Sequence, residues 1–361
     1  MKIIKIDKKL WSDGVEKSRA AYRLIGPVKD KEFHQFRELA KGEQPDMNYK
    51  NSRLSPKSIA FPQSETMFLY DLDEKAEAHH IMQDAPKDYS PRAVIGIRPY
   101  DAKAFKILDL NFNNSDYQDP YWINSYNCTT FIGLANSSPD KFDFSTSCGT
   151  GPFDDSAVDV LLVDYNDSYL AKIMTDKGSA WLNAAGFTTK NGEIDGTVKG
   201  VGEAEEDIYE IIEKLKADAE AKITSKVAFD KIKEKSILDI FNAPFWEDIA
   251  FACLNCGTCT YSCPTCWCFD IQDETKGKKG IRQKNWDSCM TSLFTVHATG
   301  HNPRHNDWER TRQRFMHKLK YFQDKYNQGI MCVGCGRCVE QCPANIDIRN
   351  ICNQMNNGEW E

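Results

Sequence analysis

The sequence lacks the features that would place a protein in or across a membrane. No apolar stretch in its 361 residues approaches the roughly 18 to 20 residues of a membrane helix. The best run, 158–163, is broken by an aspartate and followed by another. The opening residues MKIIKIDKKLW contain lysines but no apolar signal core, so we expect no secretory signal and a cytoplasmic protein.

An excess of positive charge is also missing. Lys and Arg number 46 against 53 Asp and Glu, a net charge of −7, which argues against nucleic acid or an anionic membrane as a partner. The chain has no GxGxxG fingerprint, P-loop or GxSxG elbow. No acid–base or nucleophilic constellation stands out, so we predict no catalytic residues.

Cysteine, by contrast, is plentiful. Of 14 cysteines, eleven lie between positions 253 and 342. A protein without a secretory signal stays where thiols are kept reduced, so a disulfide framework is a poor explanation and metal binding a better one.

One cysteine pattern, C-x2-C-x2-C-x3-C-P, occurs twice near the C-terminus. This run holds [4Fe–4S] clusters in bacterial two-cluster ferredoxins, and zinc is the weaker competing metal. The predicted ligands, which are also the predicted metal- and cofactor-binding residues, are Cys253, Cys256, Cys259, Cys263, Cys332, Cys335, Cys338 and Cys342.

In two-cluster ferredoxins the fourth cysteine of each run binds the other cluster. By that rule, the first cluster takes Cys253, Cys256, Cys259 and Cys342, and the second takes Cys332, Cys335, Cys338 and Cys263. Residues 264–331 separate the two runs, far more than in a small ferredoxin. We therefore predict two [4Fe–4S] clusters, which transfer single electrons.

The remaining cysteines leave alternatives open. Cys266, Cys268 and Cys289 are possible extra ligands of a third metal site, or buried thiols that fill space. We interpret three isolated cysteines as packing residues: Cys128, Cys148 and Cys352. Arg337, between two ligands, either raises the potential of the second cluster or forms a surface salt bridge.

The apolar pattern predicts a mixed α/β domain over residues 1–202, a helical linker over 203–245 and a mostly α-helical two-cluster ferredoxin-like domain over 246–361. Strand-like runs recur at 59–61, 67–70, 93–97, 130–134 and 158–163. Helical patterns cover 102–110, 169–182, 203–222 and 307–326. In the last of these, Trp308, Phe315, Leu319 and Phe322 form the expected inner face.

Several blocks of the sequence resemble a known family. CLNCGTCTYSCPTCWCFDIQDE, NWDSC, GHNPR and CVGCGRCVEQCPA are similar to the β subunit of cytosolic sulfhydrogenases. They are equally similar to an iron–sulfur subunit of anaerobic sulfite reductase and to those of flavin oxidoreductases that work with heterodisulfide reductase-type partners. SPKSIAFPQSETMFLY, VIGIRPYDAKAFKILD and SCGTGPF match blocks of the same family in the same order, so the resemblance covers roughly residues 20 to 355.

The resemblance implies an anaerobic oxidoreductase complex, a hetero-oligomer in which this chain is the electron-transport subunit. Its two clusters would pass electrons between a flavin/NAD(P)H or ferredoxin module and a terminal hydrogenase, sulfite reductase or heterodisulfide reductase-type subunit. Relatives often have cysteines where this chain has Tyr100 and in the stretches 133–136 and 142–144, so no extra cluster is expected in the α/β part. The alternative is a catalytic iron–sulfur subunit that acts directly on a disulfide or sulfur substrate through a non-standard cluster.

Overall fold

The N-terminal half is built on a mixed sheet of eight strands in the order β10-β1-β9-β8-β7-β6-β2-β3. The computed structural model describes residues 2–189, 193–194, 197–203 and 207–359. Strands β2, β6, β7 and β8 run parallel at the centre of the sheet, and the other neighbours are antiparallel. The strands are β1 (Ile3–Asp7), β2 (Arg23–Asp30), β3 (Phe33–Glu38), β6 (Arg92–Ile97), β7 (Thr129–Leu134), β8 (Val160–Tyr165), β9 (Ser168–Ile173) and β10 (Val201–Glu203).

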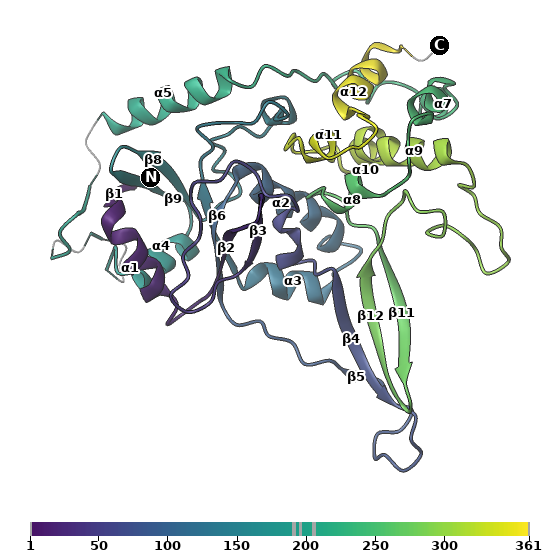
Figure 1. Cartoon of the computed structure of the whole chain (residues 1–361), viewed down its shortest axis with the longest axis horizontal. Helices are drawn as coiled ribbons and strands as arrows, with labels where there is room; N and C mark the ends of the chain where they lie inside the picture. Colours follow the sequence, from purple (N-terminus) through teal and green to yellow (C-terminus); the bar gives the residue numbers. More distant parts are fainter. Residues whose placement is uncertain (1, 190–192, 195–196, 204–206, 360–361) are drawn as a thin grey trace.

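Helices cover both faces of this sheet (Figure 1). They are α1 (Lys8–Ser18), α2 (Pro99–Phe112), α3 (Pro120–Asn127), α4 (Asp176–Ala184) and α5 (Ile208–Ala221). Phe105 of α2 and Trp122 of α3 belong to one apolar core, whereas Trp11 of α1 and Trp181 of α4 belong to the other. The central strands β6 and β7 are buried along their whole length because both faces are covered. The predicted α/β class is confirmed.

Most of the predicted strands and helices are found, and two predictions are wrong. Residues 59–61 are not a strand, because Ile59 ends a 3-10 turn over Pro56–Ile59 and the next two residues continue as a turn and a bend. Residues 169–182 form strand β9 and then α4 instead of one helix, because Thr175 caps the helix by accepting a hydrogen bond from the N–H of Gly178 at 3.2 Å. The 203–222 pattern corresponds to α5, although residues 204–206 lie outside the described residues.

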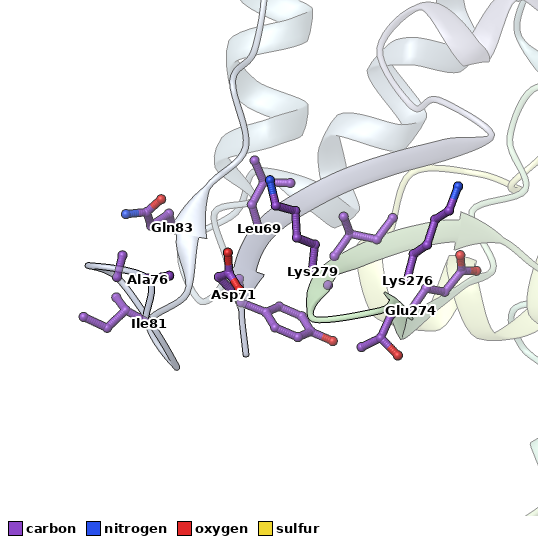
Figure 2. Close-up of a pocket in the computed structure, with 13 residues that line it drawn as sticks. Leu69, Asp71, Ala76, Ile81, Gln83, Glu274, Lys276 and Lys279 are labelled. Atoms are coloured by element: carbon purple, nitrogen blue, oxygen red, sulfur yellow. The ribbon is translucent and has the colours of Figure 1, made fainter. Parts of the chain in front are cut away.

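A second, antiparallel sheet projects from the molecule (Figure 1). Its order is β11-β12-β4-β5, with β4 (Ser64–Asp71), β5 (Gln83–Asp84), β11 (Phe269–Lys276) and β12 (Lys279–Trp286). Side chains of these strands and of the 72–82 loop line a hollow of about 500 Å³ near its tip (Figure 2). The sequence did not predict the β11–β12 hairpin. Since β4 pairs with β12, segments of the two predicted domains share one sheet, and the domain boundaries stay predictions.

The C-terminal part is a cluster of short helices. They are α6 (Ile237–Phe241), α7 (Phe245–Ala250), α8 (Thr258–Tyr261), α9 (Asp307–Met316), α10 (Phe322–Tyr326), α11 (Arg337–Glu340) and α12 (Ile348–Asn357). A π-helical turn, His317–Tyr321, joins α9 to α10, so the predicted 307–326 helix is present as one continuous element. Of its predicted inner face, Phe315 and Leu319 belong to the C-terminal core, Phe322 is also buried, and Trp308 packs partly buried against that core. None of the helices in the described part of the chain is long and apolar enough to cross a bilayer.

Candidate metal centre

The two cysteine runs share one backbone conformation. The sulfur of Cys253 accepts a hydrogen bond from the N–H of Asn255 at 3.4 Å, and Cys332 accepts the same bond from Gly334 at 3.4 Å. Asn255 and Gly334 both have positive φ, at 50° and 69°. In each run a left-handed glycine starts the short helix that follows, at Gly257 before α8 and Gly336 before α11. The sequence repeat is therefore also a structural repeat.

Gly334 offers a test of this loop geometry, because a side chain there has no space. Its φ is +69°, and a Cβ atom would lie 2.5 Å from the backbone N of Ser145. Gly149 has almost the same φ, +68°, but nothing within 4 Å of its would-be Cβ atom. We expect Gly149→Ala to cost only the left-handed penalty of roughly 1–2 kcal/mol, and Gly334→Ala to cost about 1–3 kcal/mol more and to lower the iron content. Thermal unfolding and iron analysis of both variants would measure this, and equal losses would contradict it.

Four cysteines from the two runs line one cavity. Cys253, Cys256 and Cys259 come from the first run, and Cys342 is the last cysteine of the second. Arg314 of α9 lines the same cavity. We call these four cysteines the first group. Its members are the residues predicted to bind the first cluster.

The other four predicted ligands also lie together. Cys263, the last cysteine of the first run, is buried and lies within electrostatic range of Cys332, Cys335 and Cys338. We call these four cysteines the second group. Burial raises the pKa of Cys338 to about 12, so this thiol is protonated near neutral pH unless a metal ion displaces the proton. Each group thus combines three cysteines of one run with the fourth of the other.

Arg314 lies between the two groups. It is only 4% exposed, and neither its Nε nor its Nη2 has a hydrogen-bond partner among the described residues. Burial lowers its pKa, but thiolates of both groups, led by Cys259 and Cys338, outweigh that effect and raise the pKa overall. Unpartnered, buried N–H groups are costly, so this arginine fits a site that an anionic acceptor completes.

Lys318 is a second buried cation at the centre. Its Nζ donates to Cys263 Sγ at 3.1 Å and to Thr265 Oγ1 at 3.1 Å, and lies 3.3 Å from the carbonyl of Met331. Burial lowers its pKa, and the thiolates of Cys263 and its neighbours raise it by more. The residue lies in the π-helical turn, a distortion common at functional sites.

Comparisons with known proteins bear directly on these residues. Residues 252–346, which contain both cysteine runs, match the model of a family described as 4Fe-4S dicluster domain. We call this segment the dicluster domain. The whole chain is similar to sulfhydrogenase 2 subunit beta of Pyrococcus furiosus, with 28% identity over 360 residues and 99% of each chain covered. No solved structure matches. The resemblance to an iron–sulfur β-subunit family is confirmed.

The side chains of the dicluster domain fit iron–sulfur clusters. A cluster held by four thiolates is an anion, and its sulfides accept hydrogen bonds. The domain supplies two groups of four thiols, the unpartnered N–H groups of Arg314 and the ammonium of Lys318. No three Cys, His, Asp or Glu side chains in the described part of the chain converge as closely as one metal ion requires.

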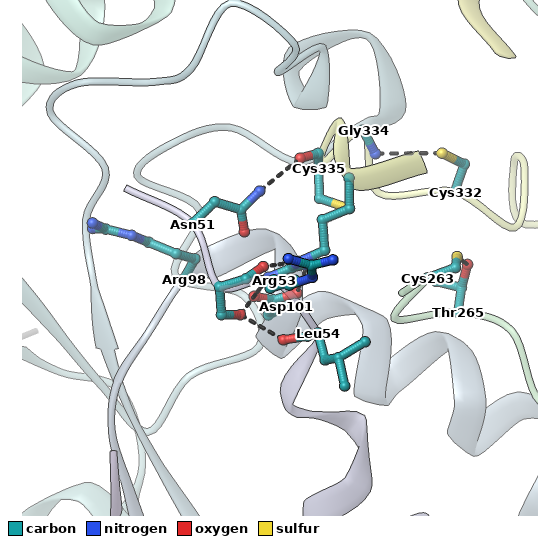
Figure 3. Close-up of polar contacts among 12 residues, drawn as sticks. Asn51, Arg53, Leu54, Arg98, Asp101, Cys263, Thr265, Cys332, Gly334 and Cys335 are labelled. Carbon is teal, nitrogen blue, oxygen red and sulfur yellow. Dashed lines mark hydrogen bonds and ion pairs between the residues drawn. The ribbon is translucent and has the colours of Figure 1, made fainter. Parts of the chain in front are cut away.

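A buried ion pair connects the dicluster domain to helix α2. Arg337 donates to the two carboxylate oxygens of Asp101, the residue labelled in Figure 3, at 2.6 and 2.7 Å. Both side chains are fully buried. Arg337 also donates to the carbonyl of Ser52 at 2.7 Å, and Asn51 donates to the carbonyl of Cys335 at 3.1 Å. The surface salt bridge considered for Arg337 is therefore wrong. The carboxylate of Asp101 offsets the positive charge of the Arg337 guanidinium. The second group therefore lies beside a neutral ion pair and not beside an isolated positive charge.

The cysteines outside the two groups fall into two kinds. Cys128 and Cys352 donate to backbone carbonyls at 3.3 and 3.4 Å, which suits the predicted packing role. Each of the others interacts electrostatically with a neighbouring cysteine: Cys148 with Cys332, Cys266 with Cys263, and Cys268 with Cys289. The sequence did not predict the Cys148 contact. The only signal was its place in the SCGTGPF block of the family resemblance.

Proposed function

We propose that this chain binds two [4Fe–4S] clusters and conducts electrons between two other redox modules. The first group would hold one cluster and the second group the other, in the crossed arrangement of two-cluster ferredoxins. The observation that carries the proposal is the pair of four-cysteine groups with the buried Arg314 between them. The clusters would supply one-electron transfer.

The protein's own residues would set how easily each cluster takes an electron. A reduced cluster carries one more negative charge, so buried cations beside it stabilise the reduced form. Arg314 would act on both groups, because thiolates of each lie within its electrostatic range. Lys318 would act chiefly on the second group through Cys263. Both cations are almost completely shielded from solvent, which strengthens these interactions.

Exposure indicates which cluster would exchange electrons with a partner. Cys256 of the first group is exposed, whereas the cysteines of the second group are partly or fully buried. Two neighbouring apolar side chains are also exposed, Phe251 at 93% and Leu254 at 69%. Exposed apolar side chains beside a cofactor are typical of an interaction surface. We infer that a redox partner docks at the first group.

The partner classes follow from the family resemblance. The similar Pyrococcus protein is named as one subunit, so we propose that this chain also works in a hetero-oligomer. One partner would be a flavin/NAD(P)H or ferredoxin module, and the other a terminal hydrogenase, sulfite reductase or heterodisulfide reductase-type subunit. We propose a cytoplasmic location for the complex.

Metal analysis of the native complex would test this function. We expect about eight iron and eight acid-labile sulfide per chain, in two clusters that take up one electron each. Two kinds of partner should co-purify anaerobically, a flavin–nicotinamide protein and a nickel–iron, siroheme or heterodisulfide protein. Zinc in place of iron, or clusters that do not change oxidation state between physiological potentials, would contradict the proposal.

The alternative is a catalytic subunit that acts on a disulfide or sulfur substrate through a non-standard cluster at Cys266, Cys268 and Cys289. The contacts of these cysteines with one another and with Cys263 are the observation in its favour. More than about eight iron per chain would support it. If serine at all three positions leaves disulfide reduction unchanged, the alternative is wrong.

A further inference from the structure

Two cysteines meet where the projecting β11–β12 hairpin joins the rest of the chain. Cys268 directly precedes β11, and Cys289 follows the end of β12 at Trp286. The carbonyl of Cys268 accepts a hydrogen bond from the N–H of Asp287 at 3.0 Å, which continues the ladder of the hairpin. The side chains of Cys268 and Cys289 interact electrostatically with each other, and both residues line the same cavity. The hairpin thus holds the two thiols against each other.

This pair differs from the other cysteine contacts. The Cys148 and Cys266 thiols each contact a predicted cluster ligand, whereas neither Cys268 nor Cys289 is one. It also differs from Cys128, whose thiol bonds to a backbone carbonyl. Two neighbouring thiols in one cavity, with no assigned metal, can form a disulfide.

The pair lies close to the first group. Cys289 is within electrostatic range of Cys259, one of the predicted ligands of the first cluster, and of Cys266. The ammonium groups of Lys57 and Lys318 act on Cys268 in turn. An electron on the first cluster would therefore be near the sulfur pair, with cations beside it.

A cavity of about 250 Å³ gives small molecules a route to the pair. Cys268 and Cys289 both contribute to its wall, together with polar side chains and aromatic rings. The other lining residues are Trp267, Phe269, Phe294, Arg304, Gln313 and His317. Cys268 is partly exposed and Cys289 only 7%, so an incoming molecule would meet the Cys268 sulfur first.

We propose that Cys268 and Cys289 form a dithiol–disulfide couple that collects two electrons from the clusters and exchanges with a small disulfide in this cavity. The inference rests on the proposed electron-transfer function, because the reduced [4Fe–4S] clusters are the reductant. The couple would combine two one-electron transfers from the clusters into one two-electron reduction of a disulfide. It differs from the non-standard cluster because it requires no iron at these cysteines.

Each step of this exchange balances in electrons and protons. The Cys268–Cys289 disulfide takes two electrons from the clusters, one at a time, and two protons from solvent, and becomes two thiols. The Cys268 thiolate then attacks a disulfide RSSR, forms a mixed disulfide and releases one RSH. The Cys289 thiolate attacks the Cys268 sulfur of that mixed disulfide, releases the second RSH and restores the internal disulfide. The sum is RSSR plus two electrons and two protons to two RSH.

Mass spectrometry of the full chain, purified anaerobically with its clusters, would test the couple. The protein is equilibrated with hydroxyethyl disulfide, quenched in acid with N-ethylmaleimide and digested with trypsin, which places Cys289 alone in peptide 285–304 and Cys268 in peptide 236–276. We expect these peptides to be linked after oxidation and separate after dithionite. Cys268→Ser and Cys289→Ser should abolish the link, and Cys128→Ser should keep it.

Activity gives the second measurement. We expect the dithionite-reduced protein to reduce hydroxyethyl disulfide at least tenfold more slowly after Cys268→Ser, with iron and sulfide unchanged. A linked peptide that never forms, or that persists in Cys268→Ser, overturns the inference. Iron loss in either serine variant overturns it as well and favours a metal site. If the wild type keeps about eight iron while the link is absent, the electron-transfer function stands and only this inference falls.

Discussion

Cys342→Ala is expected to remove the cluster of the first cysteine run and to leave the second cluster in place. Cys342 belongs to the second run by sequence, but it lines the cavity of Cys253, Cys256 and Cys259. Without its fourth thiolate the first cluster should be lost, so the iron content should fall from about eight to about four per chain. Iron analysis and electron paramagnetic resonance of the reduced protein would record the loss.

Matched alanine variants identify which cluster is lost. Cys256 lies in the first run and the first group. The signal of the cluster that remains in Cys256→Ala should therefore equal the signal that remains in Cys342→Ala. Cys335 lies in the second run and the second group, so Cys335→Ala should show only the signal of the first cluster. Cys263→Ala should show that same signal. If Cys342→Ala instead matches Cys335→Ala, each run holds its own cluster and the crossed assignment is wrong.

The spacing of the cysteines indicated which thiols lie together, because a cubane cluster needs thiols from loops of nearly fixed form; that these thiols bind clusters stays a prediction. The two runs also have left-handed residues at matching positions: Asn255 matches Gly334, and Gly257 matches Gly336. A local motif of this kind is readable from sequence because it depends little on the rest of the fold.

The cations of the site were not predictable in the same way. Arg314 and Lys318 each precede an apolar residue, Phe315 and Leu319, on the same helix. From the sequence alone, charged residues at such positions would be expected to face solvent. Both are nevertheless buried, because they point toward thiols that come from distant segments. Asp101 is a similar case, since nothing in its sequence neighbourhood connects it to Arg337, 236 positions away.

The β11–β12 hairpin was missed for a different reason. An apolar alternation marks a strand only when one face is buried, and most of β11 is exposed. Its remaining signal is Gly277, which adopts a positive φ of 64° in the turn. The long-range pairing of β12 with β4 has no local signature at all. Such tertiary pairings explain why the domain boundaries cannot be read from apolar patterns alone.

Asp101→Asn is expected to destabilise the protein and to raise the potential of the second cluster. The substitution leaves the guanidinium of Arg337 buried without its counter-charge, at a cost of about 3–5 kcal/mol. The uncompensated charge would favour the reduced cluster beside Cys335 by on the order of 1–2 kcal/mol, or on the order of 50–100 mV for one electron. Denaturant unfolding and cluster potentiometry would measure the two effects separately.

Two comparison variants separate charge from stability. Asp101→Leu combined with Arg337→Met removes both charges, so it should recover much of the lost stability and bring the potential back toward the wild-type value. Glu65→Gln disturbs another buried pair, Glu65 with Lys284 at 3.0 Å in the second sheet, and should lower stability without changing either potential. An Asp101→Asn potential equal to that of the wild type would mean that Arg337 acts only through structure. The ion pair would then hold the loop of the second group on α2 and have no part in tuning its cluster.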